Sequence, residues 1–174
     1  MFKRKAIIDD PNDVAAVEQA AVFLLGRREH SSVELARKLK QKGYAEDAVD
    51  TVLEELQERG WQSDRRYAEL LVRQRLEAAY GPLKIYQDAQ LKGLDKTLVE
   101  QLLQELAVNW QALAVERYQR RFGTQPPADK KELARRQRHL AGRGFYPQDV
   151  YAACKAAVET TAVTTAVSNK EDYF

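Results

Sequence analysis

The sequence predicts an all-α protein made of three tandem three-helix repeats, each resembling a helix-turn-helix module. Glycine and proline are scarce, with 8 and 5 among 174 residues, whereas good helix formers such as alanine, leucine and glutamate are abundant. No alternating run of apolar and β-branched residues between turn signals indicates a strand. Gly43, Gly93 and Gly144 recur at intervals of 50 and 51 residues, and a period of this size is typical of stacked supersecondary units.

Each of these three glycines is expected to end the second helix of its repeat. Apolar residues lie four positions before and one position after each glycine, as the pairs Leu39 and Tyr44, Ala89 and Leu94, and Leu140 and Phe145. In a Schellman motif these two positions are in contact, and the glycine adopts a left-handed conformation that a Cβ atom disfavours. The pattern therefore predicts three helix ends of one geometry, and a cost of about 1 kcal/mol for replacing Gly43 or Gly93 by alanine.

The second helices also begin at capping signals. The run Ser31-Ser32-Val33-Glu34 fits a capping box. Gly81 and Pro82 begin the second copy, with proline at the first helical position, and Asp129 with Glu132 begins a longer third copy. Helices this short are marginal when isolated in water, so packing against neighbours must hold them.

An amphipathic helix precedes each capped helix, and a further helix follows it. The following helices are expected at 46–58, 96–107 and 147–158. These elements predict repeats at 14–60, 61–108 and 109–158, between an N-terminal arm at 1–13 and a disordered tail at 159–174. Because the link at 60–63 is short, the repeats should form one elongated body.

Charge is distributed unevenly, although the net charge is only +2. Residues 46–58 contain six carboxylates and no lysine or arginine, whereas residues 117–143 contain nine basic residues and two carboxylates. Such a split suits a surface that meets phosphates or an acidic partner. Ordinary solvated helix faces explain it equally well at this stage.

The remaining composition indicates a cytoplasmic protein without a membrane segment. Cys154 is the single cysteine, so no internal disulfide can form, which fits a reducing compartment. The N-terminal stretch has no apolar run long enough for a signal peptide, and no segment of about 18 apolar residues could span a membrane. Cys154 takes the place of Leu53 and Leu103 in the other repeats, and we expect it to be a small core residue.

No constellation of residues indicates catalysis. The two histidines, His30 and His139, have no second ligand at metal-binding spacing. No phosphate-binding loop, nucleophile elbow or catalytic triad is present. We therefore expect no catalytic residue, no bound metal and no cofactor.

Clusters of basic residues are the strongest functional signal. Lys131, Arg135 and Arg138 share one face of the helix before Gly144. The candidate residues for contact with a polyanion are Arg27, Arg28, Arg37, Lys38, Arg117, Arg120, Arg121, Lys131, Arg135 and Arg138. Such residues bind phosphates without reading sequence. Because aromatic residues are not interleaved with them, we expect weak, salt-sensitive, sequence-nonspecific binding of single- and double-stranded DNA.

Several segments resemble the RecX family of recombination regulators. The run AVFLLGRREHSSVELARKLKQKGY resembles the opening of that family, and SDRRYAELLVRQRL followed by YGPLKIYQDAQLKGL resembles its central signature. NWQALAVERYQRRFG and RRQRHLAGRGFYPQDV resemble its C-terminal unit, so the likeness extends over roughly residues 16–156. The chain departs from the family pattern at two places: Ala79 stands where a glycine is usual, and the pair Asp88-Ala89 replaces a Glu-Leu pair.

The resemblance implies tandem three-helix repeats in an elongated, curved body without enzymatic activity. It further implies a regulator that binds the RecA filament on DNA and inhibits filament extension, ATP hydrolysis, strand exchange and the co-protease activity that drives the SOS response. The candidate basic residues would then meet RecA or DNA. The residues by themselves are also consistent with a DNA-binding helical module that makes no RecA contact, or with a helical adaptor that binds no DNA. We expect a monomer, because each repeat already has neighbours.

Overall fold

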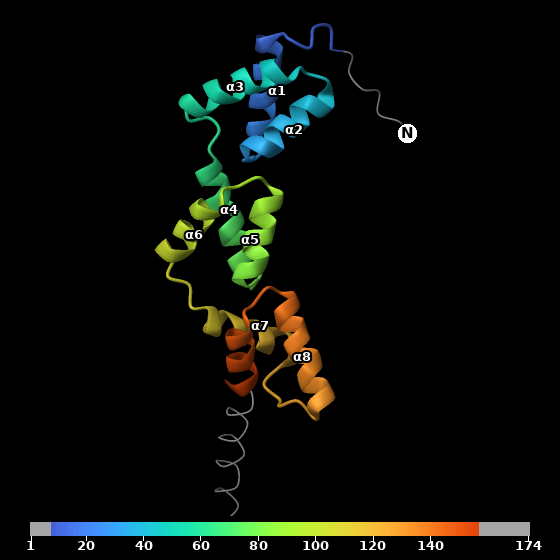
Figure 1. The fold of residues 1–174 in the computed structure, drawn as a ribbon, viewed down its shortest axis with the longest axis vertical. Coiled ribbons are helices and arrows are strands. Elements are labelled where there is room, and N and C mark those ends of the chain that lie inside the picture. Colours follow the sequence, from blue (N-terminus) through green and yellow to red (C-terminus); the bar gives the residue numbers. More distant parts are fainter. Residues whose placement is uncertain (1–7, 157–174) are drawn as a thin grey trace, which may run out of the picture. The chain divides into compact units, whose positions relative to one another are not determined.

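The computed structural model describes residues 8–156, which fold into nine helices and no strand (Figure 1). The helices are α1 (Val14–Leu25), α2 (Ser32–Lys42), α3 (Glu46–Glu58), α4 (Asp64–Glu77), α5 (Pro82–Leu91), α6 (Lys96–Glu105), α7 (Trp110–Phe122), α8 (Lys130–Gly142) and a ninth at 147–156. The all-α prediction is confirmed. The expected tail at 159–174, the first seven residues of the arm and the end of the last helix lie outside the described residues.

The helices follow one another in three sets of three, which we call the first, second and third repeat. They are α1–α3, α4–α6, and α7 with α8 and the ninth helix. The residue boundaries between repeats remain a prediction. By their contacts the described residues divide into two compact units, one comprising residues 8–71 with Ala89–Glu100 and the other Val72–Asp88 with residues 101–156. We describe each unit separately.

Each unit encloses an apolar core. In the first unit, the core residues of α1, α2 and α3 are Val17, Ala21, Leu35, Leu39, Ala48, Val49, Val52, Leu53 and Leu56. In the second unit, the core comprises residues of α7, α8, the helix at 147–156 and the loop before that helix: Ala114, Tyr118, Leu140, Phe145, Val150, Ala153 and Cys154. Cys154 is 4% exposed, so its predicted core position is confirmed.

The three glycine helix ends have the predicted geometry. Gly43, Gly93 and Gly144 have φ angles of +117°, +71° and +88°. The amide after each glycine donates to the carbonyl five residues before it, as in Tyr44 to Leu39 (3.4 Å), Leu94 to Ala89 (3.0 Å) and Phe145 to Leu140 (3.4 Å). These are the long-range bonds of the Schellman motif. Ala89 therefore supports the motif even though it is smaller than the leucines at the equivalent positions.

Two further helix ends use alanine in the left-handed region. Ala79 has a φ of +49° after α4, and Ala107 has a φ of +46° after α6. The helix predicted at 96–107 therefore ends two residues early, because Ala107 leaves the helical conformation and its amide donates to Gln104 O at 3.0 Å. Gly60 has a φ of +69° and ends α3 in the same manner, which the sequence analysis did not identify.

The predicted capping residues begin their helices, with one correction. Pro82 is the first residue of α5. Asp129 accepts from the amide of Glu132 at 2.6 Å, and Ser31 Oγ accepts from the amide of Glu34 at 3.1 Å. Only one of the two hydrogen bonds of the capping box at Ser31 forms. The Glu34 carboxylate accepts from Arg28 and not from the backbone amide at the start of the helix.

In each unit, a hydrogen bond joins two successive repeats at equivalent positions, although the donor groups differ. In the first unit, Ser31 Oγ donates to the carbonyl of Lys92 at 2.6 Å. In the second unit, the amide of Gly81 donates to the carbonyl of Arg143 at 2.9 Å. Ser31 and Gly81 each precede the second helix of a repeat, and Lys92 and Arg143 each precede a helix-ending glycine. In both units, the start of the second helix of one repeat is thus hydrogen-bonded to the glycine turn of the next repeat.

Candidate polyanion-binding site

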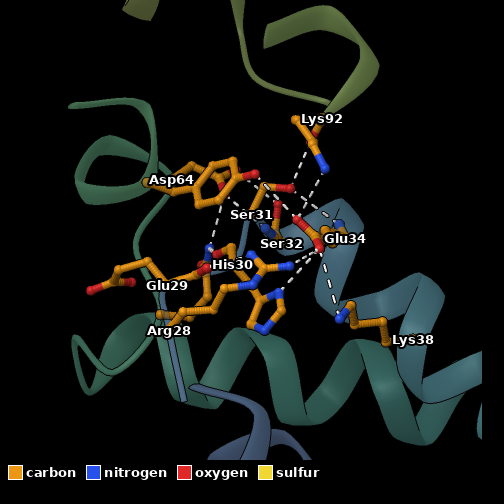
Figure 2. A network of polar contacts seen from close by, with 11 residues as sticks. Arg28, Glu29, His30, Ser31, Ser32, Glu34, Lys38, Asp64 and Lys92 are labelled. Atoms are coloured by element: carbon orange, nitrogen blue, oxygen red, sulfur yellow. Dashed lines mark hydrogen bonds and ion pairs between the residues drawn. The ribbon is translucent and has the colours of Figure 1, made fainter. Parts of the chain in front are cut away.

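A buried carboxylate neutralises part of the predicted basic set in the first unit (Figure 2). Glu34, near the start of α2, is only 4% exposed. Its carboxylate accepts from Arg28 Nη2 at 2.5 Å and from the hydroxyl of Tyr67 at 3.2 Å. Lys92 Nζ lies 3.5 Å away, and Lys38 Nζ lies 3.8 Å away. Arg28 and Lys38 are therefore the ion-pair partners of a core carboxylate.

The electrostatics of this cluster favour an ionised Glu34. Burial by itself would raise its pKa, but the hydrogen bond from Arg28 and the charges of Lys92 and Arg28 outweigh burial and lower the pKa to about 2. His30 Nδ1 lies 3.3 Å from the same carboxylate. Burial, followed by the charge of Arg28, lowers the pKa of His30, so this histidine is neutral at pH 7.

A second carboxylate joins the first two repeats within this unit. Asp64 accepts from the amide of Ser32 at 2.7 Å and from its hydroxyl at 2.8 Å. Gln62 Nε2 donates to Asp64 at 2.9 Å and to the carbonyl of His30 at 3.1 Å. These contacts connect the starts of α2 and α4 and hold the Glu34 cluster in place. The polar network around α2 is thus a structural joint.

The other two candidates of the first unit remain available to a ligand. Arg27 is exposed and lies over the ring of Phe23, with 5.6 Å between its Cζ atom and the ring centroid. Arg37 is exposed on α2. Within the described part of the chain, neither forms an ion pair.

On α8, the three candidates predicted to share one face are all exposed. Arg135 lies 3.3 Å from Glu132, and Arg138 Nε donates to the carbonyl of Ala134 at 3.3 Å. Lys131 is exposed, so water can solvate its charge. The structure therefore leaves Lys131, Arg135 and Arg138 as candidates for polyanion contact.

The intervening Arg136 has a different role. It is 5% exposed and donates to the hydroxyl of Tyr118 at 2.6 Å and to the carbonyl of Gln125 at 2.7 Å. It also pairs with Glu132 at 2.7 Å. Arg136 thus ties α7, α8 and their connecting loop together, and it was not among the predicted binding residues.

The candidates on α7 differ from one another. Arg120 forms an ion pair with Glu116 and donates to the carbonyl of Glu77 at 3.3 Å. Arg121 is exposed and lies beside the ring of Phe122. Arg117 is half-buried, and its Nε atom is buried without a hydrogen-bond acceptor.

Arg117 belongs to a group of like charges in the second unit. Burial lowers its pKa most, and the charge of Arg143 adds to the effect. The guanidinium of Arg143 lies over the ring of Tyr80, 4.7 Å from its centroid. Burial likewise lowers the pKa of His139, followed by the charges of Arg117, Arg143 and Arg121. We call Arg117, Arg121 and Arg143 the arginine cluster.

Arg143 and Tyr80 were not among the candidates predicted from the sequence. Both residues flank a structural glycine, Arg143 before Gly144 and Tyr80 before Gly81. Their proximity follows from the hydrogen bond between Gly81 and Arg143, which only the folded chain reveals. The one available signal was the basic residue at the position before the helix-ending glycine, where Lys92 stands in the second repeat.

Three family models match the chain in order along its length. The first, second and third three-helix domains of RecX match residues 19–56, 63–103 and 109–154. The chain belongs to the RecX family. The resemblance noted in the sequence segments is thereby confirmed.

Curated RecX relatives support the same conclusion. A protein named regulatory protein RecX from Pseudomonas entomophila is 41% identical over 140 residues, which cover 80% of this chain and 88% of the relative. A protein of the same name from Halorhodospira halophila is 41% identical over 144 residues, covering 83% and 89% of the two chains. The match therefore includes nearly the full length of these relatives.

Solved RecX structures have the same fold. The crystal structure of RecX from Lactobacillus salivarius superposes with a TM-score of 0.71 at 20% identity, covering 83% of this chain and 96% of that one. A second crystal structure of regulatory protein RecX gives a TM-score of 0.69 at 23% identity, covering 82% and 71%. Among the described residues, no helix has the length and apolar character needed to cross a bilayer.

Proposed function

We propose that this RecX-family protein limits recombination and the SOS response by binding the RecA–DNA filament. It inhibits filament extension and thereby the ATPase, strand-exchange and co-protease activities of RecA. The observation that carries this proposal is the match of all three RecX three-helix domains in order, together with relatives named regulatory proteins. In this proposal the protein acts in the cytoplasm as a monomer and catalyses no reaction of its own.

The exposed basic residues support contact with a nucleoprotein filament. Lys131, Arg135 and Arg138 are exposed on α8, and Arg27 and Arg37 are exposed in the first unit. A filament on DNA presents regularly spaced phosphates, which such residues bind by charge and independently of base sequence. We assign these five residues to filament contact, with DNA affinity weak and sensitive to salt.

A titration of RecA ATPase activity on circular single-stranded DNA tests the proposal. We expect the rate to fall when this protein is present at fewer than one copy per RecA monomer, because blocking filament extension affects many monomers. The triple variant Lys131→Glu, Arg135→Glu and Arg138→Glu should inhibit less. The matched control reverses Arg65, Arg73 and Lys96, three exposed basic residues outside the candidate set, with the same change in net charge.

The alternative function is a DNA-binding helical module without RecA contact. It is favoured by the arginine cluster, whose charges have no carboxylate partner among the described residues. Such a module would retain DNA with a steep salt dependence, and it would inhibit RecA only by competing for DNA. Adding excess single-stranded DNA would then restore the full ATPase rate. Inhibition that persists in excess DNA supports direct filament binding.

A further inference from the structure

The arginine cluster of the second unit differs from three other arginines of this chain, Arg28, Arg75 and Arg136. Arg28, Arg75 and Arg136 each have a carboxylate partner, at 2.5 Å from Glu34, 2.5 Å from Asp88 and 2.7 Å from Glu132. Within the described residues, Arg117, Arg121 and Arg143 form no ion pair with a carboxylate. The cluster thus gathers positive charge that the fold itself does not neutralise.

The backbone holds Arg143 in a defined position. Arg143 follows the last residue of α8, and its carbonyl accepts from Gly81 at 2.9 Å. The next carbonyl, of Gly144, accepts from Leu83 at 3.0 Å. With its main chain fixed and its guanidinium on the ring of Tyr80, Arg143 loses little freedom when it binds a ligand.

Two buried polar atoms lack hydrogen-bond partners on residues whose pKa is lowered by burial and also by the charge of Arg143. The Nε atom of Arg117 and the Nε2 atom of His139 are buried and have no hydrogen-bond partner in the structure. A buried donor without an acceptor is unfavourable, so the environment of Arg117 is not adapted to its charge. An anion placed against the exposed part of the Arg117 guanidinium would offset the repulsion between Arg117 and Arg143.

We infer that Arg117 and Arg143, flanked by Arg121, form a binding site for a phosphate group where the end of α8 meets α7 and Tyr80. The inference rests on the proposed function, for which it supplies a contact point with DNA. Guanidinium groups are planar forks that match phosphate oxygens in a bidentate manner, and two or three of them can surround one group.

The arrangement around Tyr80 excludes base stacking as its mode of recognition. Arg143 lies 4.7 Å and Arg75 lies 5.8 Å from the centroid of the Tyr80 ring. A ring occupied by guanidinium groups is not a free platform for a base. The site therefore takes the phosphate of a DNA backbone and does not read the base sequence.

The two histidines provide a direct test with inorganic phosphate. The charges of Arg117, Arg143 and Arg121 act on His139, whereas His30 lies in the Glu34 cluster of the other unit. Histidine NMR signals are followed through a pH titration with phosphate or with chloride at equal ionic strength. We expect phosphate to raise the pKa of His139 relative to chloride, with His30 unchanged. Equal His139 titrations in both salts would overturn the site.

Variants identify the residues responsible. The double variant Arg117→Gln with Arg143→Gln should lose the phosphate effect on His139, and Arg73→Gln with Lys96→Gln should retain it. Arg117→Lys keeps the charge but removes the fork, and it should weaken phosphate binding by several fold. If circular dichroism shows that the double variant is unfolded, the phosphate affinity of Arg117→Lys decides whether these arginines form the site. Undiminished phosphate binding in Arg117→Lys and in any folded double variant would contradict the assignment.

A second arm distinguishes a DNA backbone from free phosphate. An oligothymidylate is titrated at several salt concentrations. The double variant should bind it more weakly, with a salt slope reduced by about 1.4 for two lost phosphate contacts. If inorganic phosphate binds but the oligonucleotide affinity is unchanged in the variant, the assignment of the site to DNA phosphates is overturned. A variant that loses phosphate binding yet still inhibits RecA supports the site and separates it from filament contact.

Discussion

The backbones of Gly81 and Gly144 lie directly against each other. A Cβ atom built on Gly81 would come closer than 3.0 Å to the carbonyl carbon and oxygen of Gly144. Gly81 does not have a positive φ. Close approach, and not backbone conformation, therefore requires a glycine at position 81, where the second and third repeats are joined in the second unit.

Replacing Gly81 by alanine should therefore be more damaging than a simple conformational penalty. We expect Gly81→Ala to lower the free energy of unfolding by about 2–3 kcal/mol, because rigid backbone must shift to admit the methyl group. Gly43→Ala is the matched reference. It has a positive φ and only an ordinary contact with Ile8, so it should cost about 1 kcal/mol. Equal losses in urea denaturation would contradict the close-approach explanation.

Both the backbone conformation and the close approach of a neighbour require a glycine at position 93. Its φ is +71°, and a Cβ atom there would overlap the side chain of Val33. Gly93→Ala should therefore cost more than the 1 kcal/mol or so expected from conformation alone. Val33→Ala removes two of the overlapping atoms but leaves the Val33 Cβ within 2.7 Å. A double-mutant cycle by thermal denaturation should show partial rescue, and strict additivity would exclude the overlap.

Alanine in the left-handed conformation offers a stabilising substitution. Ala107 has a φ of +46° and is exposed, so Ala107→Gly should stabilise the protein by about 1 kcal/mol. Ala79 has a similar φ but is fully buried. Ala79→Gly loses a buried methyl group worth about 0.8 kcal/mol, so its net effect should be close to zero. Thermal denaturation that ranks Ala79→Gly above Ala107→Gly would contradict this account.

Glu34 should govern part of the acid sensitivity. Its pKa is lowered from 4.5 to about 2 in the folded state. A lowered carboxyl pKa contributes stability that is present above the unfolded value and is lost as pH falls from about 4.5 to 2. The contribution is of the order of 3 kcal/mol at neutral pH. Glu34→Gln should therefore be less stable at pH 7 and show a flatter pH dependence in this window.

Chemical denaturation at several pH values measures this effect. Glu46 is a suitable control because its side chain is 72% exposed in an ion pair with Lys40. The hydrogen bond from Lys40 also lowers the pKa of Glu46, but solvent screens this exposed pair, so Glu46→Gln should change the pH dependence much less than Glu34→Gln. A Glu34→Gln profile parallel to the wild type between pH 2 and 4.5 would show that Glu34 does not carry the linkage.

Variants of Arg28 and Arg37 should distinguish a residue that stabilises the fold from a residue that binds DNA. Arg28 donates to buried Glu34, so Arg28→Ala should cost about 1–2 kcal/mol, moderated because the arginine side chain is 49% exposed. Arg37→Ala should leave stability within about 0.5 kcal/mol but weaken DNA retention at low salt. A destabilised Arg37→Ala together with a DNA-binding defect in a stable Arg28→Ala would reverse these assignments.

Local chemistry made much of this fold readable from the sequence. The three Schellman motifs, the start of α5 at Pro82 and the bounds of α3 depend on residues within one or two turns of each other. Glycine conformation and proline geometry act at that range, so their spacing predicted helix ends correctly. Ala79 and Ala107 escaped prediction because alanine carries no sequence signal for a left-handed conformation.

Only the tertiary structure decided what the charges do. Lys92 and Glu34 are 58 positions apart in sequence but 3.5 Å apart in space. The packing of distant segments buries Glu34, and only this burial makes its neighbours Arg28 and Lys38 the partners of a core carboxylate. The same holds for Arg143 and Tyr80, which the Gly81 turn brings together. The sequence by itself determined the repeating pattern, the helix ends at Gly43, Gly93 and Gly144, and the family, because these depend on local order. Whether a basic side chain is paired or available depends on packing between distant segments, since a charge is neutralised by whatever lies within a few ångströms of it.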